Sequence, residues 1–281
     1  MSSRQPTDPA GSREEASPPS GRAPVVRKRA ARPGKRQQRG RITSLRGVMG
    51  GVTHLEREIF LRSVPLFAEL EDRHIHALSA MLAERRYRKG SVVFFEGDPG
   101  DALFIVSQGA VKIYRVAEDG REKTLAILRD GDIFGEMALL DEEPRSAIAE
   151  CLEPTTLYAL HRKEFLAFLA NNPSMAIHII KVLCGRLRRT NAQVMDVVFR
   201  DVKSRIVRTL LDLSQRHGIP CRAGVRIDLK LTHQELASLV GTARETVTRI
   251  LAEFQDTGFL TVDGRHLVIR DREALESLAV S

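Results

Sequence analysis

Apolar residues between positions 54 and 85 recur at helical spacing and predict two short helices. The second segment, residues 72–85, presents Ile75, Leu78 and Leu82 on one side. Residues three or four positions apart share one face of an α-helix, so each segment should bury an apolar face. The first segment begins at His54, and its apolar positions are Leu55, Ile59, Phe60, Val64 and Phe67.

From about residue 87 to residue 160 the hydrophobic period changes to two, and turn residues recur every 8–12 positions. Short, evenly spaced strands with such turns indicate an antiparallel barrel or jelly roll, although a sandwich with the same number of strands gives the same pattern. We assign residues 54–172 to this β-rich domain. Its clearest apolar runs are 92–95, 103–106, 111–114 and 125–128.

Residues 173–200 return to a helical period and predict one long helix. Two sets of residues spaced by seven interleave along it and form the stripe that is typical of a two-helix seam. A helix packed on the barrel would also explain the apolar positions. The polar pair Thr190 and Asn191 favours a dimer interface, because a buried polar residue there needs a hydrogen-bonding partner. The two sets are Ile180, Leu187 and Val194, and Leu183, Thr190 and Val197.

Two T-x-x-E patterns in the last segment, residues 201–281, predict a helix-turn-helix. Thr232 with Glu235, and Thr242 with Glu245, match the capping box that begins many helices. Gly241 precedes the second pattern and predicts a tight turn. Helices are therefore expected at about residues 233–240 and 243–255, which is the helix-turn-helix arrangement.

The second of these helices carries residues that can read DNA bases. At about 100° per residue, its apolar side chains lie away from four polar ones. Arg can pair with guanine and Glu can accept from the cytosine amino group, in the first turns of a recognition helix. A solvated helix face carries similar residues, so the motif rather than the composition supports DNA binding. The four residues are Arg244, Glu245, Thr248 and Arg249.

Asp263-Gly264 lies between two alternating apolar segments and predicts a β-hairpin after the recognition helix. A hairpin in this position makes the domain a winged helix. The whole order predicts an α+β protein with an N-terminal antiparallel β jelly roll or barrel. A long dimerisation helix and a C-terminal winged helix-turn-helix follow.

The net charge of +8 comes from the N-terminus. Residues 1–50 hold twelve Lys or Arg against three Asp or Glu, and also six of the twelve prolines. We expect residues 1–53 to be a disordered basic tail. The sequence leaves open whether this tail binds nucleic acid nonspecifically or is a dispensable extension, and Met49 is an alternative start.

Several classes of protein are not expected. No apolar run reaches the ~18–20 residues of a membrane span, and the first residues lack the apolar core of a signal peptide. Cys151, Cys184 and Cys221 are far apart, so we expect no metal site and a reducing cytoplasm. Residues 202–281 contain no P-loop, GxSxG or HExxH motif, so no catalytic residues are predicted.

Residues 134–147 resemble the phosphate-binding cassette of cyclic-nucleotide-binding domains. They share its Gly-Glu pair, the nine-residue spacing from Glu136 to Arg145 and the Pro-Arg-Ser-Ala ending. With a barrel before the cassette and a long helix after it, residues 54–275 resemble the CRP–FNR family, closest to its cyclic-AMP receptor branch. The resemblance implies a cyclic-AMP-responsive transcription regulator with cyclic AMP as its effector.

The same resemblance implies the site residues. Arg145 offers a planar fork for the two free oxygens of a cyclic phosphodiester, and Glu136 would accept from the ribose 2′-hydroxyl. Thr190 and Asn191 match a pair that reads the adenine, one residue from each subunit. The implied ligand-binding set is Gly135, Glu136, Met137, Arg145, Ser146, Thr190 and Asn191.

Arg244, Glu245 and Arg249 match the family's Arg-Glu-x-x-x-Arg pattern, which implies a TGTGA-like half-site in a palindrome. The implied partners are double-stranded DNA, a second copy of the chain and RNA polymerase, with no membrane. Another effector such as cyclic GMP, constitutive activity, and a nonspecific binder using the basic tail stay open. The implied DNA-binding set is Thr232, Gln234, Thr242, Arg244, Glu245, Thr248 and Arg249.

Overall fold

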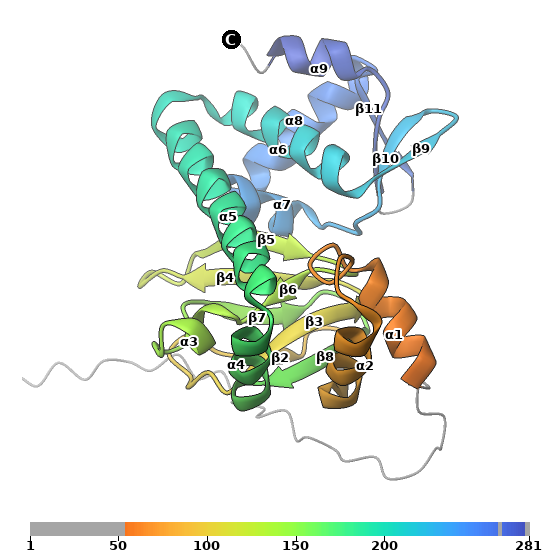
Figure 1. The fold of residues 1–281 in the computed structure, drawn as a ribbon. Coiled ribbons are helices and arrows are strands. Elements are labelled where there is room, and N and C mark those ends of the chain that lie inside the picture. The colour runs from red at the N-terminus through yellow and green to blue at the C-terminus, as the bar shows by residue number, and fades with distance from the viewer. Residues whose placement is uncertain (1–53, 264–265, 279–281) are drawn as a thin grey trace, which may run out of the picture. The chain divides into compact units, whose positions relative to one another are not determined.

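Two four-stranded antiparallel sheets form the centre of the N-terminal domain in the computed structural model (Figure 1). Their strand orders are β1-β8-β3-β6 and β2-β7-β4-β5. The structure describes residues 54–263 and 266–278, so the predicted basic tail lies outside the described residues. The strands are β1 (Ala83–Tyr87), β2 (Val92–Phe94), β3 (Ala102–Gln108), β4 (Val111–Val116), β5 (Glu122–Leu128), β6 (Ile133–Phe134), β7 (Ile148–Cys151) and β8 (Thr155–His161).

Strand β3 is almost entirely apolar because both of its faces are buried. Ala102, Phe104 and Val106 belong to the core that the strands enclose. Leu103 and Ile105 belong to a second core, which the helices share. Successive side chains of a strand point to opposite faces, and here both faces are covered. The antiparallel jelly-roll prediction is therefore confirmed.

Four helices supply the second core. Their buried residues include Leu61, Phe165 and Met175. The long helix occupies residues 173–199, in agreement with the predicted range. No single described helix is long and apolar enough to cross a membrane, and α4 with α5 meets that test only together, across a 114° bend. The helices are α1 (His54–Ser63), α2 (Asp72–Met81), α4 (Arg162–Asn171) and α5 (Pro173–Phe199).

Two predictions for the first helices are wrong in part. Leu55 and Ile59 are 64% and 61% exposed, because α1 turns the side that holds Leu61 toward the core. The second helix ends at Met81 instead of near residue 85. Residues Ala83–Tyr87 leave the helix to pair with β8 as strand β1, since the sheet supplies hydrogen bonds along the whole segment.

The C-terminal domain has one apolar core under a four-stranded antiparallel sheet of order β11-β12-β10-β9. The predicted hairpin is confirmed, because β11 pairs with β12 from Leu260 to Asp263. Gly264 lies outside the described residues. The elements are α6 (Val202–His217), β9 (Gly218–Cys221), β10 (Gly224–Ile227), α7 (His233–Val240), α8 (Arg244–Asp256), β11 (Leu260–Asp263), β12 (His266–Ile269) and α9 (Arg272–Leu278).

Strand β5 contacts helix α7 through buried polar groups. Ser238 Oγ donates to the Glu122 carbonyl at 2.9 Å, and the Thr124 amide donates to Ser238 Oγ at 3.1 Å. Lys123 Nζ donates to the Leu239 carbonyl at 2.5 Å. Burial, and then the charge of Arg205, lower the pKa of Lys123. The barrel and the first helix of the helix-turn-helix are thus joined by directional contacts.

Candidate functional site

A pocket beside the short helix α3 (Met137–Leu140) brings five of the predicted ligand-binding residues together. Strand β6 ends at Phe134 and leads directly into the segment that contains the Gly-Glu pair. The amides of Leu139 and Leu140 donate to the Glu136 carbonyl at 3.0 and 3.2 Å and so close the first turn of α3. The pocket is lined by Phe94, Ile113, Phe134, Gly135, Glu136, Met137, Ala138, Arg145, Ser146, Ala147 and Arg186.

Arg145 is the buried cation of this pocket, with its side chain only 3% exposed. It donates to the carbonyls of Gly135 at 2.7 Å and Ala102 at 2.6 Å. Its guanidinium carbon lies 4.3 Å from the ring centroid of Phe94. Burial lowers the pKa of Arg145, while the nearby Asp101 carboxylate raises it. These contacts use two of the five N–H donors of the guanidinium, and the buried Nε has no hydrogen-bond partner among the described residues.

Gly135 has to be glycine for this arrangement. Its φ of +78° is a conformation that residues with a side chain rarely adopt. A Cβ at this position would lie 2.6 Å from Arg145 Nη1. The absence of a side chain therefore lets the guanidinium approach the backbone closely, and both observations support the Gly-Glu pair as part of the site.

Glu136 is a buried carboxylate with one oxygen paired and one free. It is 1% exposed, and its Oε1 accepts from Arg186 Nη1 at 2.6 Å. Its Oε2 is buried without a hydrogen-bond partner among the described residues. Arg186 also donates to the Ile133 carbonyl. A free buried acceptor is costly, so Oε2 is ready to receive a hydroxyl donor.

The sequence prediction missed Arg186. This arginine comes from α5, fifty residues after Glu136, and only the fold shows that the two side chains meet. One signal was present in the sequence. Arg186 precedes Thr190 by four positions, so the two residues lie on neighbouring turns of one helix face.

Thr190 and Asn191 do not line the pocket. Both side chains are exposed on α5, about one helical turn beyond Arg186. The structure therefore brings together the cassette residues but not the two predicted adenine-reading residues. The exposed apolar residues of α5 surround this pair, and they include Ile180, Leu187, Val194 and Val197.

The first predicted capping box forms as expected. Thr232 Oγ1 accepts from the Glu235 amide at 3.1 Å, and Glu235 Oε2 accepts from the Thr232 amide at 2.6 Å. Helix α7 ends at Val240, and Gly241 after it has a left-handed φ of 79°. The predicted turn at Gly241 is therefore confirmed.

The second predicted capping box is wrong. The residue that precedes α8 is Ala243, and no side chain caps the helix. The backbone amide of Thr242 donates instead to the Ala237 carbonyl at 3.0 Å, as the Gly241 amide does at 2.8 Å. Thr242 thus closes the end of α7, which leaves it one residue too early to cap α8.

Helix α8 presents the predicted face to solvent. Arg244, Glu245, Thr248 and Arg249 are all exposed, whereas Val247, Ile250, Leu251 and Phe254 are buried in the core of the domain. Thr248 Oγ1 donates to the Arg244 carbonyl at 3.0 Å and lies 2.8 Å from His233 Nδ1. Gln234 is also exposed, on the first turn of α7. Two arginines and one glutamate are thus available to base edges.

Comparisons with known proteins match both domains. Residues 84–172 match the cyclic nucleotide-binding domain, and residues 204–278 match the Crp-like helix-turn-helix domain. The CRP-like cAMP-activated global transcriptional regulator of Mycobacterium tuberculosis is 38% identical over 210 residues, which are 75% of this chain and 94% of the relative. The chain belongs to the CRP–FNR family. It is a cyclic-nucleotide-binding, DNA-binding transcription regulator of that family.

Other CRP–FNR proteins show the same likeness. The cyclic AMP receptor protein of Thermus thermophilus is 34% identical over 219 residues, covering 78% of this chain and 98% of the relative. The solved structure of CLP, the c-di-GMP-responsive global regulator of Xanthomonas campestris, is 30% identical with a TM-score of 0.63. That match covers 72% of this chain and 100% of the other. These CRP–FNR proteins are transcription regulators rather than enzymes.

Proposed function

We propose that the protein is a cyclic-AMP-responsive homodimer that binds a palindromic, TGTGA-like DNA site. The observation that carries the proposal is that one pocket is lined by both a buried Arg145 and a buried Glu136 whose Oε2 has no hydrogen-bond partner among the described residues. Relatives that are 38% and 34% identical are named for cyclic AMP. We assign ligand binding to residues 54–172, dimerisation to residues 173–200 and DNA binding to residues 201–281.

Cyclic AMP fits the charges and donors of the pocket. Its single negative phosphodiester charge would face Arg145, with Gly135, Met137 and Ser146 around the phosphate. Its ribose 2′-hydroxyl would donate to Glu136, whose Oε2 has no partner among the described residues. Cyclic AMP would therefore compensate two features of the pocket that are costly to bury, the Arg145 cation and the free acceptor of Glu136.

The exposed stripe of α5 supports a homodimer. Ile180, Leu187 and Val194 are each more than half exposed, although they repeat at heptad spacing. Two copies of the helix would bury these residues against each other, which is the usual seam of a coiled coil. Thr190 and Asn191 lie on the same helix, so a dimer would bring them toward the adenine from both subunits.

Arg186 supports a link between ligand and dimer helix. Arg186 lies on α5 and donates a hydrogen bond to Glu136. A ligand hydroxyl that binds Glu136 would therefore bind a residue that is directly connected to the dimer helix. A ligand that favours one arrangement of α5 shifts a two-state equilibrium toward that arrangement. We infer that the shift places two recognition helices about 34–36 Å apart, the spacing of successive major grooves. RNA polymerase would then contact the bound dimer.

A second effector is the alternative. The solved structure of a c-di-GMP-responsive regulator is 30% identical to this chain, so the fold alone leaves the choice of effector open. Cyclic GMP also carries a phosphodiester and a ribose hydroxyl, and would use the same Arg145 and Glu136. Constitutive DNA binding without any effector is the third case.

Titration calorimetry with cyclic AMP, cyclic GMP and c-di-GMP tests the proposal. We expect one site per chain with the highest affinity for cyclic AMP, and a loss of about 10-fold or more in Arg145→Lys, which removes the planar fork. The matched control is Arg121→Lys, since Arg121 is exposed and pairs with Asp119. Tighter binding of another nucleotide, or equal binding by Arg145→Lys, would overturn the proposal.

A further inference from the structure

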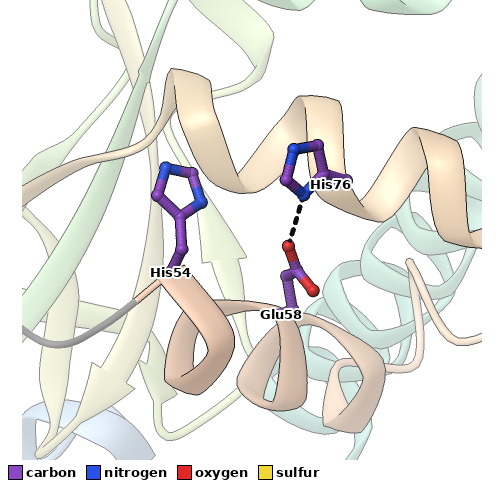
Figure 2. A group of neighbouring side chains, drawn as sticks. All are labelled: His54, Glu58 and His76. Carbon is purple, nitrogen blue, oxygen red and sulfur yellow. Dashed lines mark hydrogen bonds and ion pairs between the residues drawn. The ribbon is translucent and has the colours of Figure 1, made fainter.

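Three potential metal ligands gather between the first two helices. His54 and Glu58 come from α1 and His76 from α2, and Figure 2 shows their side chains converging between the helices. Each residue offers one ligand atom, and these three atoms lie within 4.8 Å of one another. His76 Nδ1 is 2.7 Å from Glu58 Oε1. We propose that these residues bind a divalent transition-metal ion of the zinc class.

The packing of α1 against α2 fixes the positions from which the three side chains project. His54 and Glu58 are four residues apart, so they project from one face of α1. Leu61 of α1, with Ile75 and Leu78 of α2, is at most 1% exposed and belongs to the same apolar cluster. Packing therefore sets the distance between the two helices, and the three ligands need only side-chain adjustment to share an ion.

A buried serine restrains the first imidazole. His54 Nδ1 lies 3.0 Å from Ser79 Oγ, and Ser79 is fully buried. Ser79 Oγ in turn donates to the His76 carbonyl at 2.8 Å, so its own proton is already in use. Histidine ligands of metals usually have such an outer hydrogen-bonding partner, which orients the ring. Ser79 would serve as that partner here.

Two imidazoles and one carboxylate define the class of ion. Nitrogen and oxygen donors of this kind suit Zn²⁺, Co²⁺ or Ni²⁺, whereas Mg²⁺ and Ca²⁺ prefer oxygen alone. Zinc bonds of about 2.0–2.2 Å hold tetrahedral ligand atoms roughly 3.4 Å apart. His76 Nδ1 and Glu58 Oε1, now 2.7 Å apart, would therefore separate slightly, and the ligand nitrogen of His54, which lies within 4.8 Å of the other two ligand atoms, would adjust to the same spacing. His54 and His76 are exposed, so packing does not oppose that adjustment, and the Ser79 contact is to Nδ1 of His54. A fourth position would stay open for water or another ligand.

An ion pair between Glu58 and His76 alone does not explain why His54 lies beside them. Glu58 contacts the imidazole of His76, while the ring centroids of His54 and His76 lie 5.8 Å apart. A divalent cation accepts a lone pair from both neutral rings and from Glu58. Within the part of the chain that the structure describes, no other group of three residues meets the same criterion.

The prediction of no metal site rested on the cysteines alone. His54 and His76 are 22 residues apart, and only the packing of α1 against α2 brings them together. A metal bound to both helices would oppose their separation and would stabilise the folded chain, because the unfolded chain lacks the site. This proposal is independent of the cyclic-nucleotide pocket.

The test uses the full chain without an affinity tag, first stripped of metal with a chelator. Zn²⁺ is titrated by calorimetry, and Co²⁺ is followed by its visible absorption, which separates nitrogen and oxygen ligands from thiolates. The variants are His54→Ala, His76→Ala and Glu58→Gln. The control is His178→Ala, since His178 pairs with a single carboxylate, Glu69, at 3.3 Å.

We expect one Zn²⁺ per chain and an affinity about 10- to 100-fold lower in each triad variant, with no change in the control. The midpoint temperature of thermal unfolding should rise when Zn²⁺ is added to the wild-type chain, and it should not change in His76→Ala. Glu58→Gln keeps the shape of the side chain, so a loss of Zn²⁺ affinity in this variant cannot be attributed to misfolding. Equal Zn²⁺ binding by wild-type and triad variants, or an equal loss in His178→Ala, would overturn the proposal.

Discussion

Arg186 Nη1 lies 2.6 Å from Glu136 Oε1, which places a cation of the long helix α5 on the buried carboxylate of the ligand pocket. The arginine side chain is 28% exposed and the glutamate side chain 1%. The pair is therefore solvated from one side only. This contact is the direct structural link between the pocket and the helix that carries the exposed apolar stripe.

Arg186→Met should destabilise the ligand-free protein by about 1–3 kcal/mol, because it leaves a buried carboxylate without its partner. Glu136→Gln in the same chain should recover part of that loss, since a neutral amide is less costly to bury. Chemical denaturation of the two single variants and the double variant measures the coupling. Additive free energies of unfolding would show that the pair does not interact.

Leu187→Glu should convert the proposed dimer to monomers at micromolar concentration. The stripe of α5 would then bury a charge on each side of the seam, at a cost of several kcal/mol. Sedimentation equilibrium measures the mass of the species. The control is Ala192→Glu, an exposed position of α5 outside the stripe. A wild-type monomer, or an unaffected Leu187→Glu dimer, would contradict the prediction.

Arg244→Ala should weaken binding to a TGTGA-containing palindrome by about 1–3 kcal/mol and relax the base preference at one position of each half-site. Fluorescence anisotropy with wild-type and single-base-substituted duplexes at fixed salt measures both effects. Arg272→Ala is the matched control, because Arg272 is exposed on α9 and pairs with Glu276. An equal loss on every duplex would mean that Arg244 contacts phosphate only.

His217 should make the C-terminal domain less stable in acid. Burial lowers the pKa of His217 to about 4 from the ordinary 6.5, with the charges of Arg216 and Arg129 adding to the effect. Between these values the unfolded chain binds the proton and the folded chain does not, so stability is full above pH 6.5 and falls toward pH 4.

Urea denaturation between pH 4.5 and pH 7.5 measures this slope. His217→Gln should flatten it, because glutamine does not titrate in that range. His161→Gln should leave it unchanged, since His161 is exposed at the end of β8. A slope that stays the same in His217→Gln would show that other groups cause the acid sensitivity.

The regular elements were predictable where the local pattern and the packing agree. Helix α5 spans residues 173–199 as its heptad stripe predicts, and α7 starts at a capping box that forms in full. The end of α2 was predicted four residues too late, because β1 gains its hydrogen bonds from β8, about seventy residues away along the chain. A local period contains no information about such a partner.

The site was predictable where its residues are close in sequence. The segment from Gly135 to Ser146 forms one side of the pocket, so a short motif was enough to find it. Arg186 and the His54–His76 pair depend on contacts between distant segments, which the sequence pattern does not reveal. The prediction that Thr242 caps α8 was wrong for another reason. Thr242 suited two positions, and it follows the end of α7 instead of directly preceding α8.

The affinity for a TGTGA-containing palindromic duplex, measured by anisotropy with and without saturating cyclic AMP, tests the central claim most directly. The account predicts that cyclic AMP strengthens binding by about 5- to 150-fold, the usual range of an allosteric coupling. It predicts no strengthening in Arg145→Lys and none on a scrambled duplex. Equal affinities of the wild-type protein in the two conditions would contradict it.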